Sequence, residues 1–238
     1  MMRLSLPALA ASLAVPLSAC GHAPGYPGNP PQRPDDVSTF AALYSENCEA
    51  CHGQNGQNGP AIDLGNPEFQ AHIDNTSLRK WIASGMPGTQ MPAFAQSAGG
   101  TLTDQQVDAL VAGMRKAWSS PNAFGGATPP AYAPSQPGDP HRGQQTYNAR
   151  CAMCHEPSHQ QITSSAYLQL VSDQVLRDII IAGRPDIGQP DWRHDSLGGK
   201  LASPLSAEDV DDIVAYLGTL RNPAPAVAGL APSAPSGR

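Results

Sequence analysis

The chain has 238 residues, of which 25 are proline and 23 are glycine, and only 5% are aromatic. A small domain with so little apolar material usually needs a disulfide, a metal or a bound cofactor to be stable. The formal net charge is −6 and no stretch is rich in lysine and arginine, which argues against a nucleic-acid partner.

The N-terminus is typical of a targeting segment, which we predict to span residues 1–19. Arg3 supplies a positive charge, and the apolar stretch that follows is too short to remain as a membrane span. The segment ends in the letters LSAC, which resemble the bacterial lipobox, where cleavage precedes a cysteine that is then lipidated. The alternative is an ordinary signal peptide with a chance cysteine. We expect a mature protein that begins at Cys20, lies on the periplasmic side and is anchored to a membrane by its lipidated Cys20.

Proline and glycine divide the rest of the chain. Residues 20–36 hold several prolines and are predicted to form an extended tether. Residues 119–140 are a second stretch rich in proline and glycine, and they link two longer segments, 37–118 and 141–221. Residues 222–238 consist mainly of proline, alanine and serine and are predicted to be disordered.

The two longer segments are copies of each other. The pattern from Leu78 through Ile82 to Gly85 returns from Leu176 to Gly183. Each copy ends in an amphipathic pattern behind a serine or threonine capping signal. Its apolar residues are Val107, Leu110, Val111 and Met114 in the first copy, and Val210, Ile213, Val214 and Leu217 in the second. We therefore predict an all-α fold of two small tandem helical domains joined by the linker.

Four of the five cysteines lie in two C-x-x-C-H motifs, which end at His52 and His155. This spacing matches c-type haem attachment, in which two thiols bind the haem covalently and the histidine binds its iron. A four-cysteine zinc site, disulfides and thioredoxin-like redox pairs are alternatives, but none explains a histidine directly after both pairs. We predict two covalently bound c-type haems, held by Cys48, Cys51, Cys151 and Cys154.

The sequence resembles the class I c-type cytochromes over both segments. The resemblance rests on the C-x-x-C-H motifs, the loop from Gly85 to Met91-Pro92 and the final helix. It implies two cytochrome c-like domains, in which a Met-Pro step after the middle helix supplies the second axial iron ligand. Met91 is the matching residue, and Met86, which also precedes a proline, is the alternative. Ligation by histidine and methionine raises the reduction potential of a haem.

The second copy departs from this pattern. Aligning Gly183 with Gly85 places Gln189 where the first copy has Met91. An amide oxygen is a weak ligand for ferrous iron and could leave an open position. His194 would be a strong ligand but requires the loop to bend. His159 is close in sequence to the proximal side. The candidates for the second axial ligand are therefore Gln189, His194 and His159. In each case we expect the second haem to have a lower potential than the first, because a thioether best stabilises ferrous iron.

The remaining histidines and acidic residues have no motif around them. We interpret His22, His72 and His141 as surface or loop residues. The acidic cluster begins the last helix, where carboxylates favour the positive end of the helix dipole. Its members are Glu208, Asp209, Asp211 and Asp212.

These features predict a membrane-anchored dihaem electron-transfer protein, a carrier or a subunit of a respiratory complex rather than an enzyme. Resemblance to dihaem lipoproteins of this family implies redox protein partners, namely a membrane quinol-oxidising complex or a terminal oxidase. The alternative is a dihaem oxidoreductase, peroxidase-like or oxidising sulfur oxyanions, that uses the second haem as an open catalytic site.

Overall fold

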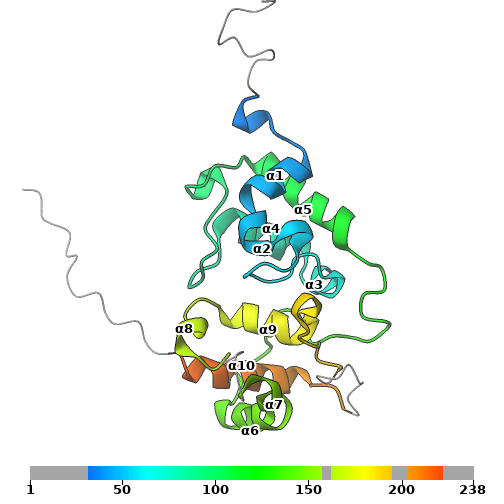
Figure 1. The fold of residues 1–238 in the computed structure, drawn as a ribbon, viewed down its shortest axis with the longest axis vertical. Helices are drawn as coiled ribbons and strands as arrows, with labels where there is room; N and C mark the ends of the chain where they lie inside the picture. The colour runs from blue at the N-terminus through cyan, green and yellow to red at the C-terminus, as the bar shows by residue number, and fades with distance from the viewer. Residues whose placement is uncertain (1–31, 157–161, 195–202, 222–238) are drawn as a thin grey trace, which may run out of the picture.

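The computed structural model describes residues 32–156, 162–194 and 203–221. Within these ranges the chain forms helices, short turns and isolated bridges but no β-strand, which confirms the predicted all-α fold. Two helical domains lie one above the other, the first blue to green and the second pale green to red (Figure 1). The predicted signal segment, Cys20, His22, His159 and the tail from residue 222 lie outside the described residues.

The first domain is built around a long final helix that packs against the first and middle helices. Its helices are α1 (Phe40–Asn47), α2 (Glu49–His52), α3 (Pro67–His72), α4 (Asn75–Ser84) and α5 (Asp104–Trp118), with short 3-10 turns at Pro34–Asp36, Gln54–Gly56 and Gln96–Ala98. The predicted capping box is present, since Thr103 and Gln106 each accept a hydrogen bond from the backbone N–H of the other. The predicted apolar side chains of α5 are all buried.

The second domain repeats this plan. Its helices are α6 (Pro140–Arg150), α7 (Ala152–His155), α8 (Ser165–Leu168), α9 (Asp173–Ala182) and α10 (Ala207–Thr219), with a 3-10 turn at Pro185–Ile187. The helix α10 packs along α6 and against α9. Its predicted capping box forms between Ser206 and Asp209, and its predicted apolar residues are buried.

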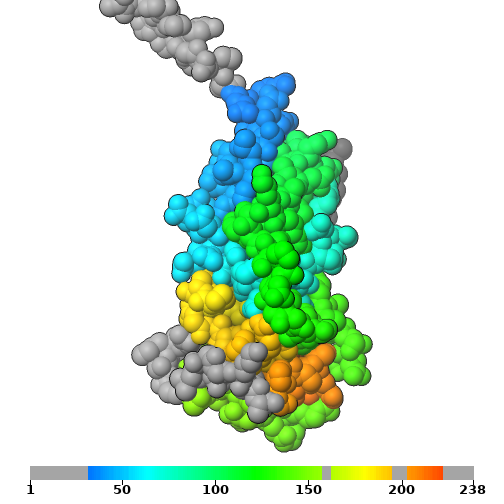
Figure 2. Space-filling view, turned by 90° about the vertical axis from the view of Figure 1, so that its right-hand side faces the viewer, coloured from blue at the N-terminus to red at the C-terminus, as the bar shows by residue number. Residues whose placement is uncertain are grey.

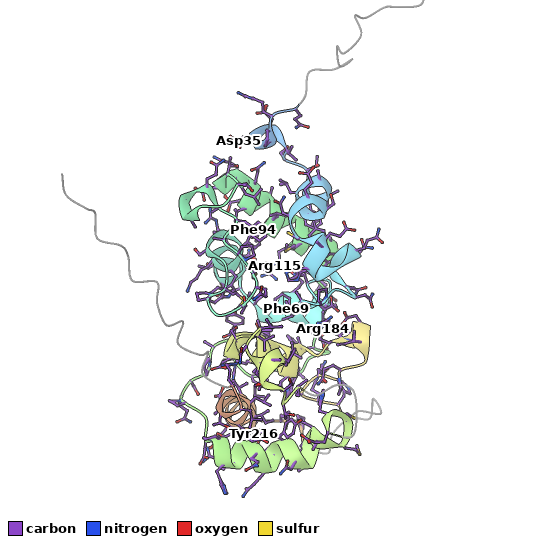
Figure 3. All side chains as sticks on the ribbon, turned by 60° about the vertical axis from the view of Figure 1, so that its left-hand side comes forward. Asp35, Phe69, Phe94, Arg115, Arg184 and Tyr216 are labelled. Carbon is purple, nitrogen blue, oxygen red and sulfur yellow. The ribbon has the colours of Figure 1, made fainter. Side chains whose placement is uncertain are left out.

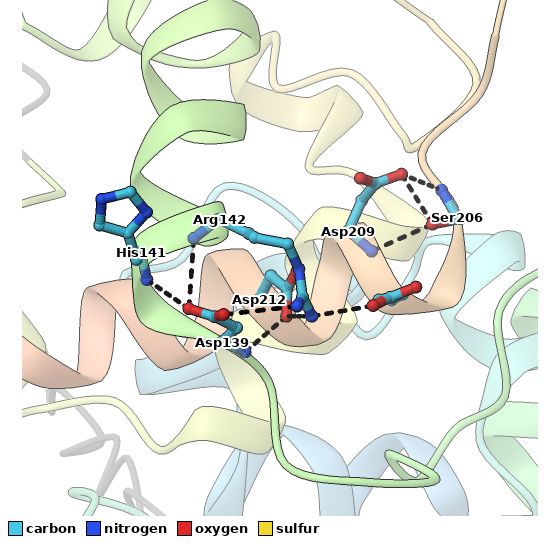
Figure 4. Close-up of polar contacts among 7 residues, drawn as sticks. Asp139, His141, Arg142, Ser206, Asp209 and Asp212 are labelled. Carbon is cyan, nitrogen blue, oxygen red and sulfur yellow. Dashed lines mark hydrogen bonds and ion pairs between the residues drawn. The ribbon is translucent and has the colours of Figure 1, made fainter.

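Two members of the acidic cluster on α10 lie in the interior, so the dipole interpretation is incomplete for them. Asp212 accepts a hydrogen bond from Arg142 Nε at 2.7 Å, and Arg142 also binds Glu208 at 2.8 Å (Figure 4). Asp211 forms a buried ion pair with Arg177 of α9. A buried carboxylate without such a partner would be strongly destabilising, so these contacts fix α10 against α6 and α9.

The two domains pack against each other through α3 and α9. Asn66 is buried at this boundary and serves both domains. Its Oδ1 accepts a hydrogen bond from the Glu68 N–H at the start of α3, while its Nδ2 donates to the Ala182 carbonyl at 2.9 Å. Ala182 itself packs into the core of the first domain. The sequence left open whether the domains pack together, and the structure shows that they do.

The linker ties the domains together as it crosses the boundary, where it runs over the surface shown in Figure 2. The Tyr132 hydroxyl accepts a hydrogen bond from Trp81 Nε1 of the first domain at 2.7 Å. The Tyr132 carbonyl accepts hydrogen bonds from Gln174 and Arg177 of the second domain. One linker residue thus contacts α4 and α9 at the same time.

The interpretation of His72 as a surface residue was wrong, although His141 is exposed as expected. The His72 side chain is 2% exposed, and its Nε2 lies 3.6 Å from Asp178 Oδ1 across the domain boundary. Burial lowers the pKa of His72 to about 4 and raises the pKa of Asp178 to about 8. The pair is therefore neutral at pH 7. The apolar periodicity of the first domain did not indicate that His72 is buried, because the residues that cover it belong to the second domain.

We expect Asp178→Asn to remove a pH-dependent loss of stability. Above about pH 6.5 an unfolded chain has released both protons of the pair, whereas the folded chain keeps the Asp178 proton until about pH 8. The free energy of unfolding therefore falls as pH rises through this window, by up to about 1.4 kcal/mol per pH unit. His72, whose folded pKa is depressed, acts only below pH 6.5.

Thermal unfolding of the holoprotein at pH 6.5 and 8.5 checks this prediction. The fall in melting temperature between the two pH values should be smaller in Asp178→Asn than in the wild type. The exposed Asp108→Asn variant is the control and should keep the full fall. Parallel curves for all three proteins would contradict the assignment.

Candidate haem-binding sites

The two C-x-x-C-H motifs adopt the same backbone conformation. Cys48 and Cys151 have nearly equal dihedral angles, φ −120° and ψ −35° against φ −118° and ψ −39°. The following histidine N–H donates to the first cysteine's carbonyl in both copies, at 3.0 Å for His52 and 3.1 Å for His155. Each motif thus forms one helical turn, with both thiols and the imidazole leaving from it.

The alternative chemistries find no support in these positions. None of the four cysteines is in a disulfide. The two pairs lie on α2 and α7 in different domains, and the described ranges contain no cluster of three or more cysteine, histidine or acidic side chains placed to hold a metal ion. A four-cysteine zinc site is therefore not assembled by this fold.

His52 is oriented by the segment that follows its motif. Its Nδ1 lies 2.8 Å from the Ile62 carbonyl oxygen. Donation from Nδ1 leaves the Nε2 lone pair for a metal, which is the arrangement that metal-binding histidines use. Burial of the ring lowers the pKa of His52, and the nearby Arg184 of the second domain lowers it further. The imidazole is therefore held neutral, as an iron ligand requires.

Glycine lets this segment lie directly on the attachment turn. A Cβ atom at Gly59 would lie 2.3 Å from the Cys51 carbonyl oxygen and 2.5 Å from the His52 carbonyl carbon. The Ala61 N–H also donates to the Cys51 carbonyl at 2.9 Å. The segment 58–63 and the first haem-attachment turn therefore form one packed unit.

Met91 lies on a tight loop after α4. Gly85 opens the loop at φ +71°, where a Cβ would meet the Met91 carbonyl. The Met86 N–H donates to the Met91 carbonyl at 3.1 Å, and Thr89 Oγ1 accepts from the Met91 N–H at 3.1 Å. The Met91 side chain is half-buried and packs against the first-domain core together with Phe94. Met86 is half-buried on the same loop.

The second domain has an equivalent loop that begins and closes in the same way. Gly183 opens it at φ +72°, and the Arg184 N–H donates to the Gln189 carbonyl at 2.9 Å. The structure thus places Gln189 where the first domain has Met91, as the alignment of the repeats predicts. By the same pairing, Arg184 stands where the first domain has Met86.

Gln189 is the candidate that the structure brings to the second attachment turn. Its Oε1 lies 3.2 Å from His155 Nε2, so the two side chains face each other. The Nδ1 of His194 lies 2.8 Å from Asp191 Oδ1. In both domains the thiols and the imidazole come from one helical turn and the candidate second ligand from the loop after the middle helix, as the sequence indicated. This set of donors fits a covalently bound haem.

Each attachment turn also reaches the surface. Cys51 and Cys154 are exposed, whereas Cys48 is buried and Cys151 half-buried. A haem held at these positions would have part of its edge close to solvent. Exchange of electrons with a partner requires such an edge, and a buried cofactor would not offer it.

The sequence reasoning missed the contact between the two sites. Arg184 and Asp186, on the loop that carries Gln189, bind the backbone of Asn58 and Gly59 beside the first attachment turn. The only available signal was a mismatch between the copies, since an arginine replaces Met86. That mismatch alone does not show which residues the arginine contacts.

Two family models match the chain. The model described as cytochrome c oxidase, cbb3-type, subunit III matches residues 35–112, and the cytochrome c model matches residues 140–221. No curated protein matches the chain.

Several solved structures are similar to parts of the chain. The c-type cytochrome KustC0563 is 26% identical, with a TM-score of 0.30, over 34% of this chain and 99% of its own. The dihydro-heme d1 dehydrogenase NirN, in complex with DHE, is 29% identical, with a TM-score of 0.29, over 42% of this chain and 23% of its own. The Kuenenia stuttgartiensis reducing HAO-like protein complex is 17% identical, with a TM-score of 0.42, over 76% of this chain and 95% of its own. These TM-scores are too low to indicate a shared overall fold.

The identity of the chain follows from its two matched domains. Each contains one C-x-x-C-H motif on a helical turn. With two cytochrome c domains in tandem, the chain is a dihaem c-type cytochrome that carries two covalently bound haems.

Proposed function

We propose that this cytochrome is an electron carrier whose two haems have unlike iron ligands. In this proposal His52 and Met91 bind the first iron, and His155 binds the second. Gln189 either binds the second iron weakly or leaves its sixth coordination position open. The observation that carries the proposal is the pair of equivalent loops, with Met91 in one and Gln189 in the other. When bound, each haem supplies one-electron exchange between ferric and ferrous iron, and the ligands set the potential of each.

The arrangement of the domains supports transfer within one molecule. Asn66 and the linker residue Tyr132 tie the domains together, so the two haem sites are held at a fixed separation. Because the exposed Cys51 and Cys154 belong to different domains, each haem would present its own edge. Electrons would enter at one domain and leave at the other.

The proposed location is the periplasmic side of a membrane, with lipid on Cys20 as the anchor. Covalent attachment suits this compartment, because the haem cannot dissociate where it would not be replaced. None of the helices in the described ranges is both long enough and apolar enough to cross a membrane. The proposed partners are a membrane quinol-oxidising complex or a terminal oxidase, and the match of the first domain to an oxidase subunit family supports them. The net charge of −6 favours basic docking faces.

One observation favours a second candidate function. Gln189 is a poor ligand for ferrous iron, so the second haem could bind a small molecule such as peroxide or a sulfur oxyanion. The chain would then be a dihaem oxidoreductase, with the first haem delivering or removing electrons. Both functions share the open second iron, and turnover of peroxide or thiosulfate by the purified protein would select the second one.

Carbon monoxide tests the open second iron. We expect it to bind one of the two haems in the reduced wild-type protein, because carbon monoxide needs a free or weakly held position on ferrous iron. Gln189→Met should abolish this binding by supplying a firm thioether ligand. Optical titration with carbon monoxide measures both. If the wild type excludes carbon monoxide and His194→Ala admits it, His194 is the ligand and our assignment of Gln189 is wrong.

The ligand of the first haem is tested by a pair of methionine variants. We expect Met91→Leu to lose the long-wavelength Met–iron absorption band and to lower the first haem's potential. The fall should be on the order of 0.1 V or more, since axial ligands move haem potentials over about 0.8 V. Met86→Leu, on the same loop, should keep both the band and the potential. The reverse result would assign Met86 as the ligand.

A further inference from the structure

We propose that Arg184 and Asp186, an ion pair of the second domain, are positioning residues that couple the two haem sites. They lie on the loop that presents Gln189 and hold the segment that orients His52, so their charges set the potential of the first haem. This inference rests on the proposed ligands of the first haem.

The pair is buried where the domains meet. The two side chains are 7% and 1% exposed. Arg184 Nε and Nη2 donate to the two carboxylate oxygens of Asp186, each at 2.8 Å. This bidentate geometry holds both side chains in one orientation. The guanidinium also holds the pKa of Asp186 below its usual range, so both groups are charged at neutral pH.

Each member of the pair also binds the first domain. Arg184 Nη2 donates to the Gly59 carbonyl at 3.1 Å, and the Asn58 N–H donates to Asp186 Oδ2 at 2.9 Å. Figure 3 places Arg184 at the boundary between the domains. The contacts are made to backbone atoms, so they fix the position of the chain at Asn58 and Gly59 rather than of one side chain.

From Gly59 the contact continues to the first iron ligand. Gly59 packs on the backbone of the attachment turn, and three residues later the Ile62 carbonyl lies 2.8 Å from His52 Nδ1. On the other side, Arg184 and Gln189 exchange backbone hydrogen bonds in both directions, at 2.9 and 3.0 Å. The ion pair therefore lies between Gln189, which faces His155, and the segment that orients His52.

The comparison of the copies shows that the pair is particular to this boundary. The first-domain loop has Met86 and Gly88 where the second has Arg184 and Asp186, and neither Met86 nor Gly88 carries a charge. The backbone differs here as well, since Gly88 has φ +76° whereas Asp186 lies in the 3-10 turn Pro185–Ile187. A buried arginine and aspartate at these positions indicate a role that only the second copy has. That role is contact with the other domain.

Burial makes these charges effective at the first haem. Charges removed from water are poorly screened, so a single uncompensated charge acts over a longer range than on the surface. Both charges are held at the Asn58 and Gly59 backbone, beside the turn that carries His52. A nearby positive charge disfavours ferric iron and raises the potential, whereas a negative charge lowers it. The intact pair balances these effects.

The test is a redox titration of the haem-loaded full chain, with the first haem followed by its Met–iron band. Arg184→Gln leaves Asp186 uncompensated and should lower the first haem's potential. Asp186→Asn leaves Arg184 uncompensated and should raise it. The double variant should return toward the wild-type value, and Arg184→Lys, which keeps the charge, should lie closer to the wild type than Arg184→Gln.

Arg193→Gln is the matched control. Arg193 also crosses the boundary, where it pairs with Glu68 of the first domain, so its loss loosens the same interface without removing the charge beside His52. We expect little shift of the first haem's potential in this variant. Shifts of the same sign in Arg184→Gln and Asp186→Asn, or an equal shift in Arg193→Gln, would show a purely structural role and overturn the inference. Absence of the Met–iron band in the wild type would instead contradict the proposed ligands.

Discussion

The attachment of each haem to a single helical turn is the constraint on which the rest of the molecule depends. Two thiols and an imidazole leave one turn, so this turn alone would fix the position of a bound haem iron. The remaining helices position the loop after α4 or α9, which would supply a ligand on the other side of the bound haem. Because the domains are small and poor in aromatic residues, the haem also supplies apolar bulk that the side chains do not.

Duplication of this plan allowed the two sites to diverge while the loop after the middle helix kept the same opening and closing contacts. The loops after α4 and α9 open at glycines with the same conformation and close with the same hydrogen bond. Between these ends the backbone differs, since Gly88 has φ +76° where Asp186 lies in a 3-10 turn. Among the side chains, Gln189 replaces Met91 and Arg184 replaces Met86. In our proposal the first change alters the iron ligand, and the second places a charged loop residue in contact with the neighbouring domain. Two copies of one fold can thereby perform unequal roles in a single electron-transfer chain.

The features that could be predicted from the sequence depend on residues close together in the chain. The capping boxes at Thr103 and Ser206 and the attachment turns are of this kind, and local spacing determines them. His72 and Arg184 could not be placed in this way, because the partners of each come from the other domain more than a hundred residues away. The burial of Asp211 could not be predicted either, because its ion pair with Arg177 depends on how α9 packs against α10.

The central claim is that one chain holds two haems with different axial ligands, and a redox titration of the wild-type protein with simultaneous optical spectra tests it most directly. We predict two separate one-electron waves, with the Met–iron band present only in the haem that titrates at the higher potential. Two superposed waves, or a Met–iron band in both haems, would contradict the account.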